Sequence, residues 1–266
     1  MNLEVLKLNF DAVEERIAEF IRGIVDEAGA DGVVVGLSGG VDSSTVATLA
    51  ASALGAENVL GLIMPSSTTK QEDIDDALLV ARTLGIEVEY VAIQPLEDAF
   101  AKVCPRYDPG NLVATGNLKP RFRMTTLYYY ANLLNRIVAG TGNKSEILVG
   151  YFTKYGDGGV DMLPIGDLYK TQVRWLAEKI GVPRKIVWKT PTAGLWAGQT
   201  DEGEIGVTYD VLDLTLYGLI ELKYTPEKVS KEMGIPPETV MKVMEMVSKS
   251  EHKRKPIPKP ELQLLH

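Results

Sequence analysis

Apolar residues along the chain follow two patterns, one typical of buried parallel strands and the other of helices. Short β-branched runs predict strands buried on both faces. Longer stretches with apolar residues every three or four positions predict amphipathic helices. The expected strands are 33–35, 60–64 and 88–93, with a fourth strand or strand end at 147–150. The expected helices are 10–28, one from residue 42, 70–84, 96–103, 125–138 and 168–180.

The order of these elements predicts the fold class. Strands alternate with helices in the first half of the chain, which favours an α/β fold with a doubly wound parallel sheet flanked by helices. After about residue 190 only helices are expected, at 209–220, 226–233 and 237–250. We therefore expect one domain over 1–266, with an α/β core at about 10–190 and a helical part with a tail at 191–266.

Two later segments have no strong periodicity. The stretch 199–206 is polar, acidic and contains glycine, so it is predicted to be poorly ordered without ligand. The tail that begins at Glu251 is basic and rich in proline, which is typical of a solvated extension.

Composition and charge exclude several classes of protein. The 266 residues are 45% hydrophobic and 24% charged, as in an ordinary globular protein. The net charge of −8 argues against a general nucleic-acid binder, and no apolar run approaches the ~20 residues of a membrane span. The only cysteine, Cys104, rules out an internal disulfide and a cysteine zinc cluster. It fits a cytoplasmic location.

A glycine loop directly after the first strand is the main candidate for chemistry. Ser38, Gly39 and Gly40 break the strand, and a helix follows from Asp42. Such a loop directs backbone N–H groups at a ligand and suits a phosphate. It is not a Walker A loop, because it has no lysine. Asp42 would repel a phosphate unless a cation such as Mg²⁺ lay between them. A lone Ser-Gly-Gly could also be an ordinary turn.

The full pattern of this loop, together with later segments, carries a family resemblance. Ser38, Gly39, Gly40, Asp42 and Ser43 resemble the pyrophosphate loop of the ATP pyrophosphatases. The segments that resemble ammonia-dependent NAD synthetases follow in order at 116–124, 140–146, 152–161, 168–170, 191–193 and 251–253. The resemblance covers about 31–255 and implies the adenine nucleotide alpha-hydrolase-like fold. It also implies an enzyme that joins ammonia to deamido-NAD (nicotinic acid adenine dinucleotide) through an acyl adenylate, releasing NAD, AMP and diphosphate.

The resemblance also implies roles for particular residues. Asp42 and Glu146 match carboxylates that bind Mg²⁺. A cation is required because the substrate carboxylate and the triphosphate of ATP are both anions and must approach each other. The residues that match ATP contacts are Gly36, Leu37, Ser38, Gly39, Gly40, Val41, Asp42, Ser43, Thr141, Lys170 and Thr192. Those that match deamido-NAD contacts are Arg121, Lys154, Asp161, His252 and Lys253. An anionic dinucleotide needs cationic partners, whereas Asp161 suits a ribose hydroxyl or the pyridinium.

The assembly and the nitrogen donor follow from similar arguments. The family is homodimeric, with deamido-NAD near the dimer contact, and the predicted helix at 125–138 is apolar on more than one face. We therefore expect this helix in a dimer interface. Only 37 residues precede Ser38, too few for a glutaminase domain, so free ammonia is the expected donor. A separate glutaminase subunit stays open.

Two other functions are compatible with the glycine loop. The first is another ATP pyrophosphatase, such as a tRNA-thiolating enzyme. Those relatives usually bring cysteine pairs or an RNA-binding domain, and this chain has one cysteine and an acidic pI near 5.0. The second is a non-catalytic nucleotide-binding module, which would not need Glu146 or the basic tail. Turnover of ATP to AMP with and without deamido-NAD separates these hypotheses.

Overall fold

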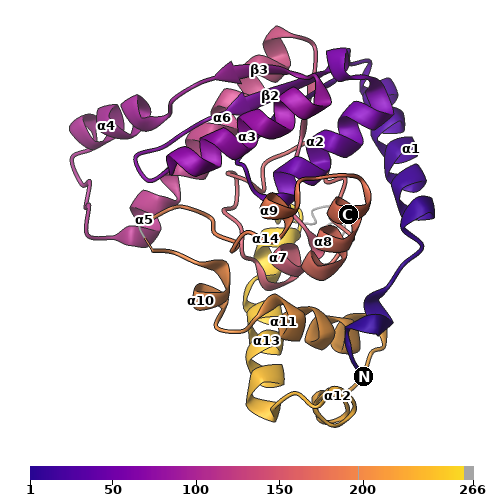
Figure 1. The fold of residues 1–266 in the computed structure, drawn as a ribbon. Coiled ribbons are helices and arrows are strands. Elements are labelled where there is room, and N and C mark those ends of the chain that lie inside the picture. Colours follow the sequence, from indigo (N-terminus) through magenta and orange to yellow (C-terminus); the bar gives the residue numbers. More distant parts are fainter. Residues whose placement is uncertain (197, 261–266) are drawn as a thin grey trace, which may run out of the picture.

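A parallel sheet of four strands organises the molecule (Figure 1). The computed structural model describes residues 1–196 and 198–260. The strands are β1 Val33–Gly36, β2 Val59–Ile63, β3 Glu87–Tyr90 and β4 Ile137–Ala139, in the order β3-β2-β1-β4. The chain builds β2 and β3 on one side of β1 and then returns to its other side with β4. This reversal creates a switch point at the carboxyl ends of β1 and β4, where ligands bind in open α/β sheets. The predicted doubly wound α/β fold is confirmed.

Helices cover both faces of the sheet. Val33 and Val35 of β1 point to a core shared with α1 Phe10–Ala28, α2 Val41–Leu54, α3 Gln71–Leu84 and α8 Lys170–Lys179. Val34 points to the opposite core, shared with α6 Leu118–Leu133. This alternation follows from the two-residue period of a strand. Because all three valines are fully buried, the strand reads as a continuous apolar run in the sequence.

The remaining elements are short or belong to the C-terminal part. In the sheet region they are η2 Ala56–Asn58, α4 Gln94–Val103, α5 Leu112–Gly116, α7 Lys144–Val149 and α9 Arg184–Val187. The N-terminal element is η1 Leu3–Leu6. The C-terminal part consists of α10 Asp201–Ile205, α11 Tyr209–Leu216, η3 Tyr217–Glu221, α12 Pro226–Met233, α13 Pro237–Lys249 and α14 Glu251–Arg254.

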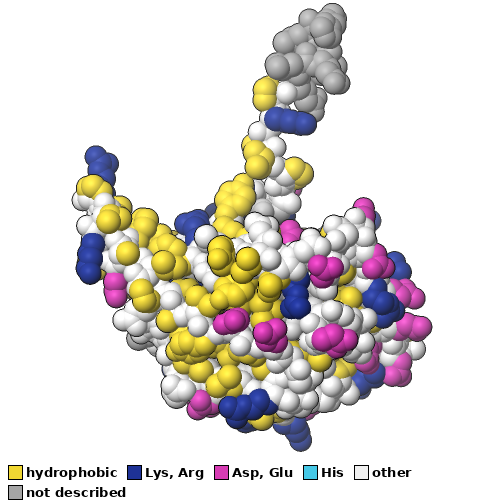
Figure 2. Space-filling view, turned by 90° about the horizontal axis from the view of Figure 1, so that it is seen from above, with side chains coloured by type: hydrophobic (Ala, Val, Ile, Leu, Met, Phe, Trp, Pro, Cys, Tyr) yellow, Lys and Arg dark blue, Asp and Glu magenta, His cyan; other side chains and the backbone are white. Residues whose placement is uncertain are grey.

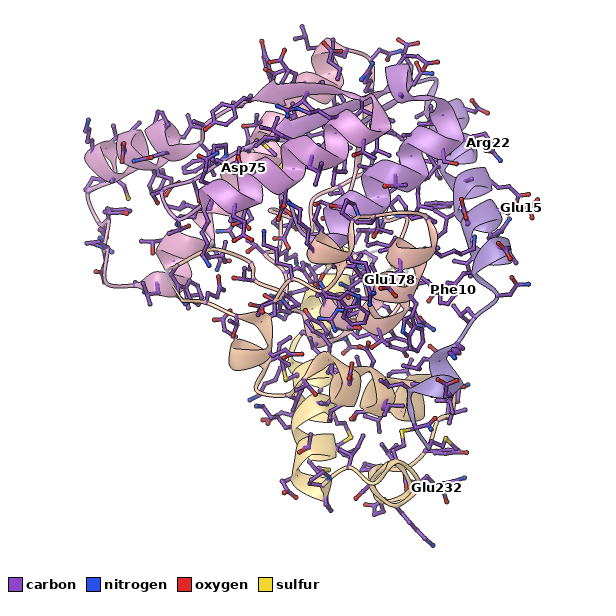
Figure 3. All side chains as sticks on the ribbon, in the orientation of Figure 1. Phe10, Glu15, Arg22, Asp75, Glu178 and Glu232 are labelled. Carbon is purple, nitrogen blue, oxygen red and sulfur yellow. The ribbon has the colours of Figure 1, made fainter. Side chains whose placement is uncertain are left out.

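Side chains fix α8 against its neighbours, and this helix is important for the site. Phe10, labelled in Figure 3, packs edge-on against Trp175 of α8 with ring centroids 6.4 Å apart. Glu178, also labelled, accepts a hydrogen bond of 2.8 Å from the indole of Trp188. These contacts hold the middle and the C-terminal end of α8, and Lys170 is the first residue of the helix.

The C-terminal helices join the α/β part around α7 and α8, below the sheet in Figure 1. A buried apolar cluster contains Leu6 of η1, Val149 of α7 and Tyr209, Leu212 and Leu216 of α11. The N-terminal segment therefore packs on helices that lie some 200 residues later in sequence. Among the described residues, no helix has the length and apolar character to span a membrane.

The predicted fourth strand is wrong. Residues 144–149 form helix α7, and the strand is Ile137–Ala139, which we had placed at the end of a helix. A capping box between Asn143 and Glu146 starts α7, and Gly150 in the left-handed conformation ends it. The long helix stops earlier because Asn135 has a positive φ of 50°. The apolar run around Ile137 fits either a helix or a strand, and pairing with β1 decides between them.

Other boundaries also differ from the predictions. The helix expected to begin at residue 125 is α6, which begins at Leu118. Pro120 does not prevent the earlier start, because a proline is tolerated in the first turn of a helix. The helix expected at 168–180 begins at Lys170, with Tyr169 as its N-cap. The segment 199–206 is not poorly ordered. It contains α10, whose Asp201 and Ile205 are buried and whose N-cap Thr200 accepts a hydrogen bond from Gly203 N.

Candidate active site

The glycine loop lies at the switch point of the sheet, between β1 and α2. Gly39 has φ +75°, and a Cβ there would lie 2.2 Å from the carbonyl oxygen of Asp73, so only glycine fits. Ser43 Oγ accepts from Ser38 N at 3.2 Å and donates to Gly40 O at 3.1 Å. The buried serine therefore holds the loop against the start of α2. At that end, a helix N-terminus favours a bound anion.

A cavity of about 510 Å³ opens beside this loop. Its walls come from the carboxyl ends of β1, β2 and β4, from α6, and from the segment 190–196. The predicted site residues that line it are Gly36, Leu37, Ser38, Gly39, Gly40, Val41, Asp42, Thr141, Glu146, Lys170, Thr192 and Lys253. Ser43, Arg121, Lys154, Asp161 and His252 are not among the lining residues. The structure thus brings all but one of the predicted ATP residues to one cavity.

A buried lysine joins two carboxylates at this cavity. Lys170 Nζ lies 2.5 Å from Asp42 Oδ2 and 3.2 Å from Glu146 Oε1. The Lys170 side chain is only 2% exposed, so it is shielded from water. Asn143 Nδ2 donates to the second oxygen of Asp42 at 3.1 Å. Three elements, α2, α7 and α8, therefore direct their first turns at one point.

Burial and charge shift the pKa values of this cluster. Burial raises the pKa of Glu146 to about 7, although Lys170 opposes the shift. Burial lowers the pKa of Lys170, but Asp42 and Glu146 together raise it above its usual range. Lys170 therefore stays positively charged at neutral pH. Perturbed titratable groups that meet in a cavity are typical of a catalytic or binding site.

Residues that the sequence did not single out complete the cluster. Tyr209 OH lies 3.2 Å from Glu146 Oε1 and 3.1 Å from Asp201 Oδ2. Asp201 lines the cavity and is 4% exposed, and its Oδ1 is buried without a hydrogen-bond partner in the described chain. Burial also raises the pKa of Asp201. In the sequence, Asp201 is one of several acids in the segment 199–206, which we had predicted to be poorly ordered.

The far wall of the cavity is tied together by Lys119. Its Nζ donates to Thr68 Oγ1 at 2.9 Å and to Leu195 O at 2.8 Å. Thr68 Oγ1 in turn donates to Gly194 O at 2.5 Å. These bonds join the loop after β2 to the segment that carries Thr192. The hydroxyl of Thr192 donates to Gln199 O at 2.8 Å.

Three of the basic residues predicted to bind deamido-NAD form a chain outside the lining. Arg121 donates to Lys154 O at 3.3 Å, and Lys154 Nζ donates to His252 O at 3.2 Å. Lys253 Nζ donates to the carbonyls of Gly150 and Phe152, both at 2.7 Å. The tail therefore folds back as α14 and is not a free extension at these positions.

Asp161 has a separate environment. Its Oδ2 accepts from Val138 N at 2.8 Å, and its Oδ1 accepts from Tyr128 OH at 2.9 Å. Burial, followed by the bond to Asp161, raises the pKa of Tyr128. The carboxylate thus connects the loop after α7 to β4 and to α6.

Fold and site together define an α/β nucleotide-binding enzyme of the adenine nucleotide alpha-hydrolase-like type. The model of the family described as NAD synthase matches residues 13–257. The NH(3)-dependent NAD(+) synthetase of Archaeoglobus fulgidus is 51% identical over 248 residues, which are 93% of this chain and 95% of the relative. That of Pyrococcus horikoshii is 52% identical over 249 residues, 93% of each chain.

Solved structures agree with these relatives. The NH3-dependent NAD synthetase of Campylobacter jejuni superposes with a TM-score of 0.81 at 32% identity, over 96% of this chain and all of that one. An NMN synthetase from Francisella tularensis gives a TM-score of 0.84 at 36% identity, over 96% and 99%. The chain belongs to the NAD synthase family. The prediction of an ammonia-dependent NAD synthetase, a ligase that uses ATP, is confirmed by these comparisons.

Proposed function

We propose that the cavity amidates deamido-NAD in two steps. In the first, a nicotinate carboxylate oxygen bonds to the α-phosphorus of ATP, and the bond to the diphosphate leaving group breaks. In the second, the nitrogen of ammonia bonds to the carbonyl carbon, the bond to AMP breaks and the nitrogen loses a proton. The single observation that carries this proposal is the meeting of Asp42, Glu146 and Lys170 beside the glycine loop.

The donor set at this point fits Mg²⁺. Asp42 and Glu146 offer hard carboxylate oxygens at the cavity, which are the ligands that Mg²⁺ prefers. We assign these two residues to the metal, and the metal, when bound, neutralises charge between the carboxylate and the triphosphate. The chain contributes the orientation, because Lys170 and Asn143 hold the Asp42 carboxylate from two sides.

The ATP residues have complementary tasks. Backbone N–H groups of Ser38, Gly39 and Gly40 at the start of α2 suit the phosphates. Thr141 follows β4, and Thr192 lies in the segment 190–196 of the far wall. Lys170 supplies positive charge where the diphosphate leaves. Its raised pKa supports this role, because the ammonium form persists at neutral pH.

The deamido-NAD residues suggest that a second subunit completes the site. Arg121, Lys154 and His252 form one chain of contacts outside the cavity lining, and Lys253 lines the cavity. Hydrophobic side chains gather on the face shown in Figure 2, in its middle and along the arm at the left where Figure 1 has α4. On α6, Tyr129 is 63% and Leu133 62% exposed. A homodimer would cover such a surface.

The other parts of the proposal follow from the same residues. Because α10, α11 and α14 carry residues of the site, we treat 1–266 as one functional domain. The single cysteine supports a cytoplasmic location. The partners are small molecules and a second copy of the chain, with no nucleic acid or membrane.

Turnover of ATP to AMP with and without deamido-NAD tests the function. We expect AMP, diphosphate and NAD in equal amounts, and only when deamido-NAD and ammonium are both present. AMP formation that needs tRNA instead would favour a thiolating enzyme. Because one structural neighbour is called an NMN synthetase, nicotinic acid mononucleotide serves as a competing substrate. A higher kcat/KM for the mononucleotide would overturn the assignment of deamido-NAD.

A further inference from the structure

One face of α11 presents two buried polar residues to the site. Tyr209 and Asp213 are four positions apart, so they lie on the same side of the helix. Both are fully buried within a mostly apolar contact between α11, α7 and α8 (Figure 1). Burying polar groups is costly unless they are hydrogen-bonded, so their partners indicate their purpose.

Tyr209 contacts two members of the charged cluster. Its hydroxyl reaches Glu146 at 3.2 Å, and the Nζ of Lys170 lies 5.0 Å from the centre of its ring. The same hydroxyl also reaches Asp201 at 3.1 Å. A phenol has one proton to donate, so at any moment the hydroxyl donates to one of the two carboxylates while it lies within hydrogen-bonding distance of both. The ring provides a surface that favours the lysine ammonium.

Asp213 holds the starts of two helices. Its Oδ1 accepts from Ser145 Oγ at 2.5 Å, and its Oδ2 accepts from Thr171 N at 2.8 Å. Ser145 Oγ in turn accepts from Lys170 N at 2.9 Å. Backbone N–H groups in the first turn of a helix have no partner within the helix. Asp213 therefore satisfies two of them in α8, one directly and one through Ser145, the neighbour of Glu146.

We infer that Tyr209 and Asp213 are positioning residues of the ligase site. Tyr209 orients the carboxylate of Glu146, and Asp213 sets α7 and α8 at the spacing that brings Glu146 and Lys170 together. This inference rests on the roles proposed above for Glu146 and Lys170. It explains why α11, which follows the α/β core in sequence, packs directly beneath the site with polar groups on its inner face.

Apolar packing alone does not account for these residues. Leu212 and Leu216 of α11 belong to the same buried cluster and supply its apolar contacts. A phenylalanine at position 209 would keep the aromatic ring and its packing. Within the part of the chain that the structure describes, the hydroxyl of Tyr209 and the carboxylate of Asp213 form hydrogen bonds only with groups at or next to the proposed site.

The variant Tyr209→Phe tests the inference. Groups that orient metal ligands typically contribute about 10–100-fold to metal affinity or activity. We expect kcat to decrease by about 10–100-fold. The KM for deamido-NAD should change by no more than a few-fold. Tyr217→Phe is the matched control, because Tyr217 packs against the same buried cluster from η3, directly after α11. The control should retain kcat within a few-fold.

A binding measurement separates positioning from a loss of structure. Trp196 lines the cavity, so its fluorescence can follow ATP binding without deamido-NAD. For Tyr209→Phe we expect half-maximal ATP binding to need about 10–100-fold more Mg²⁺ than in the unsubstituted enzyme. The melting temperature of the variant should stay close to that of the unsubstituted enzyme. Unchanged kcat and an unchanged Mg²⁺ requirement would overturn the inference. Because this assay contains no deamido-NAD, it remains decisive even if the proposed substrate is wrong.

A second pair of variants covers the case in which Tyr209→Phe does not fold. Asp213→Asn keeps the shape of the side chain and removes its charge, and Asp210→Asn makes the same change at an exposed position of α11. We expect only Asp213→Asn to lower kcat and weaken ATP binding. Equal behaviour of the two variants would show that α11 serves packing alone.

Discussion

Lys170 Nζ lies 2.5 Å from Asp42 Oδ2, although 128 positions separate the two residues in sequence. The contact joins the first turn of α8 to the first turn of α2, directly behind the glycine loop. Removing one partner of a buried ion pair typically costs about 3–5 kcal/mol, because the other charge is left uncompensated. Asp42 therefore has a structural contact in addition to its proposed contact with Mg²⁺.

The first prediction concerns this carboxylate. Asp42→Asn should lower the rate of diphosphate release by at least about 10²-fold, because the loop loses its cation bridge. It should also lower the melting temperature, since Lys170 loses a partner. The control is Asp75→Asn, at an exposed position of α3 that is labelled in Figure 3. It should release diphosphate at the rate of the unsubstituted enzyme and have the same melting temperature. Diphosphate release at a near-normal rate in Asp42→Asn would refute the metal role.

The second prediction concerns the nitrogen donor. NAD should form with ammonium and not with glutamine that has been freed of ammonia. Cys104 is the only cysteine of the chain and follows α4, away from the residues that line the cavity. Cys104→Ser should therefore keep the activity within a few-fold. Comparable rates with the two donors, measured as NAD produced, would contradict this prediction.

The third prediction concerns assembly. The protein should be a homodimer in light scattering, with α6 in the interface. Tyr129→Asp should shift the molar mass toward the monomer and lower the affinity for deamido-NAD, because a charge would be buried without a partner. Met241→Asp changes an apolar residue of α13 that is 49% exposed, and it should leave the dimer intact. A fully active monomer would rule out the proposed assembly.

The fourth prediction concerns the tail. Truncation after Ser250 should raise the KM for deamido-NAD, but it also removes Arg254, which donates to the carbonyls of Ile147 and Leu148 at the end of α7. Lys253→Met is therefore the cleaner change. We expect a higher KM for deamido-NAD, nearly normal ATP binding and AMP in excess of NAD, because a less enclosed acyl adenylate meets water.

Lys259→Met, at an exposed position of the tail, is the control for this change. Steady-state kinetics with AMP and NAD both counted provide the measurement. One AMP per NAD and an unchanged KM in Lys253→Met would show that the tail only supports the fold.

The fifth prediction concerns stability and pH. Burial raises the pKa of Asp213 from 3.8 to about 6. The protonated form is thus favoured in the folded state, and the stabilisation that it contributes is complete below about pH 4 and lost as the pH rises toward 6. The free energy of unfolding of the enzyme should therefore fall over this range relative to Asp213→Asn, by on the order of 2 kcal/mol. Urea unfolding of both proteins at about pH 4 and pH 6 measures this change. If the free energies of unfolding of the enzyme and of Asp213→Asn differ by the same amount at the two pH values, the raised pKa is contradicted.

The sequence by itself determined the strands and helices that follow strong local rules. The valine run of β1 has the length and β-branching of a buried strand, and the glycines after it exclude a continued strand or helix. The helix expected at 226–233 is α12, with Thr225 as its N-cap and Pro226 at its first position, both favoured there by local chemistry. These signals act over a few neighbouring residues. They were sufficient to recognise the family and to nominate Asp42, Glu146 and Lys170.

Only the tertiary structure decided the features that depend on distant partners. The run Ile137–Ala139 is a strand because it pairs with β1, and its local pattern fits a helix equally well. Asp201 is buried at the cavity although its surroundings in sequence are acidic and polar. The contacts of Tyr209 and Asp213 with α7 and α8 follow from the packing of α11. Burial and long-range pairing are properties of the whole fold, so no local pattern carries them.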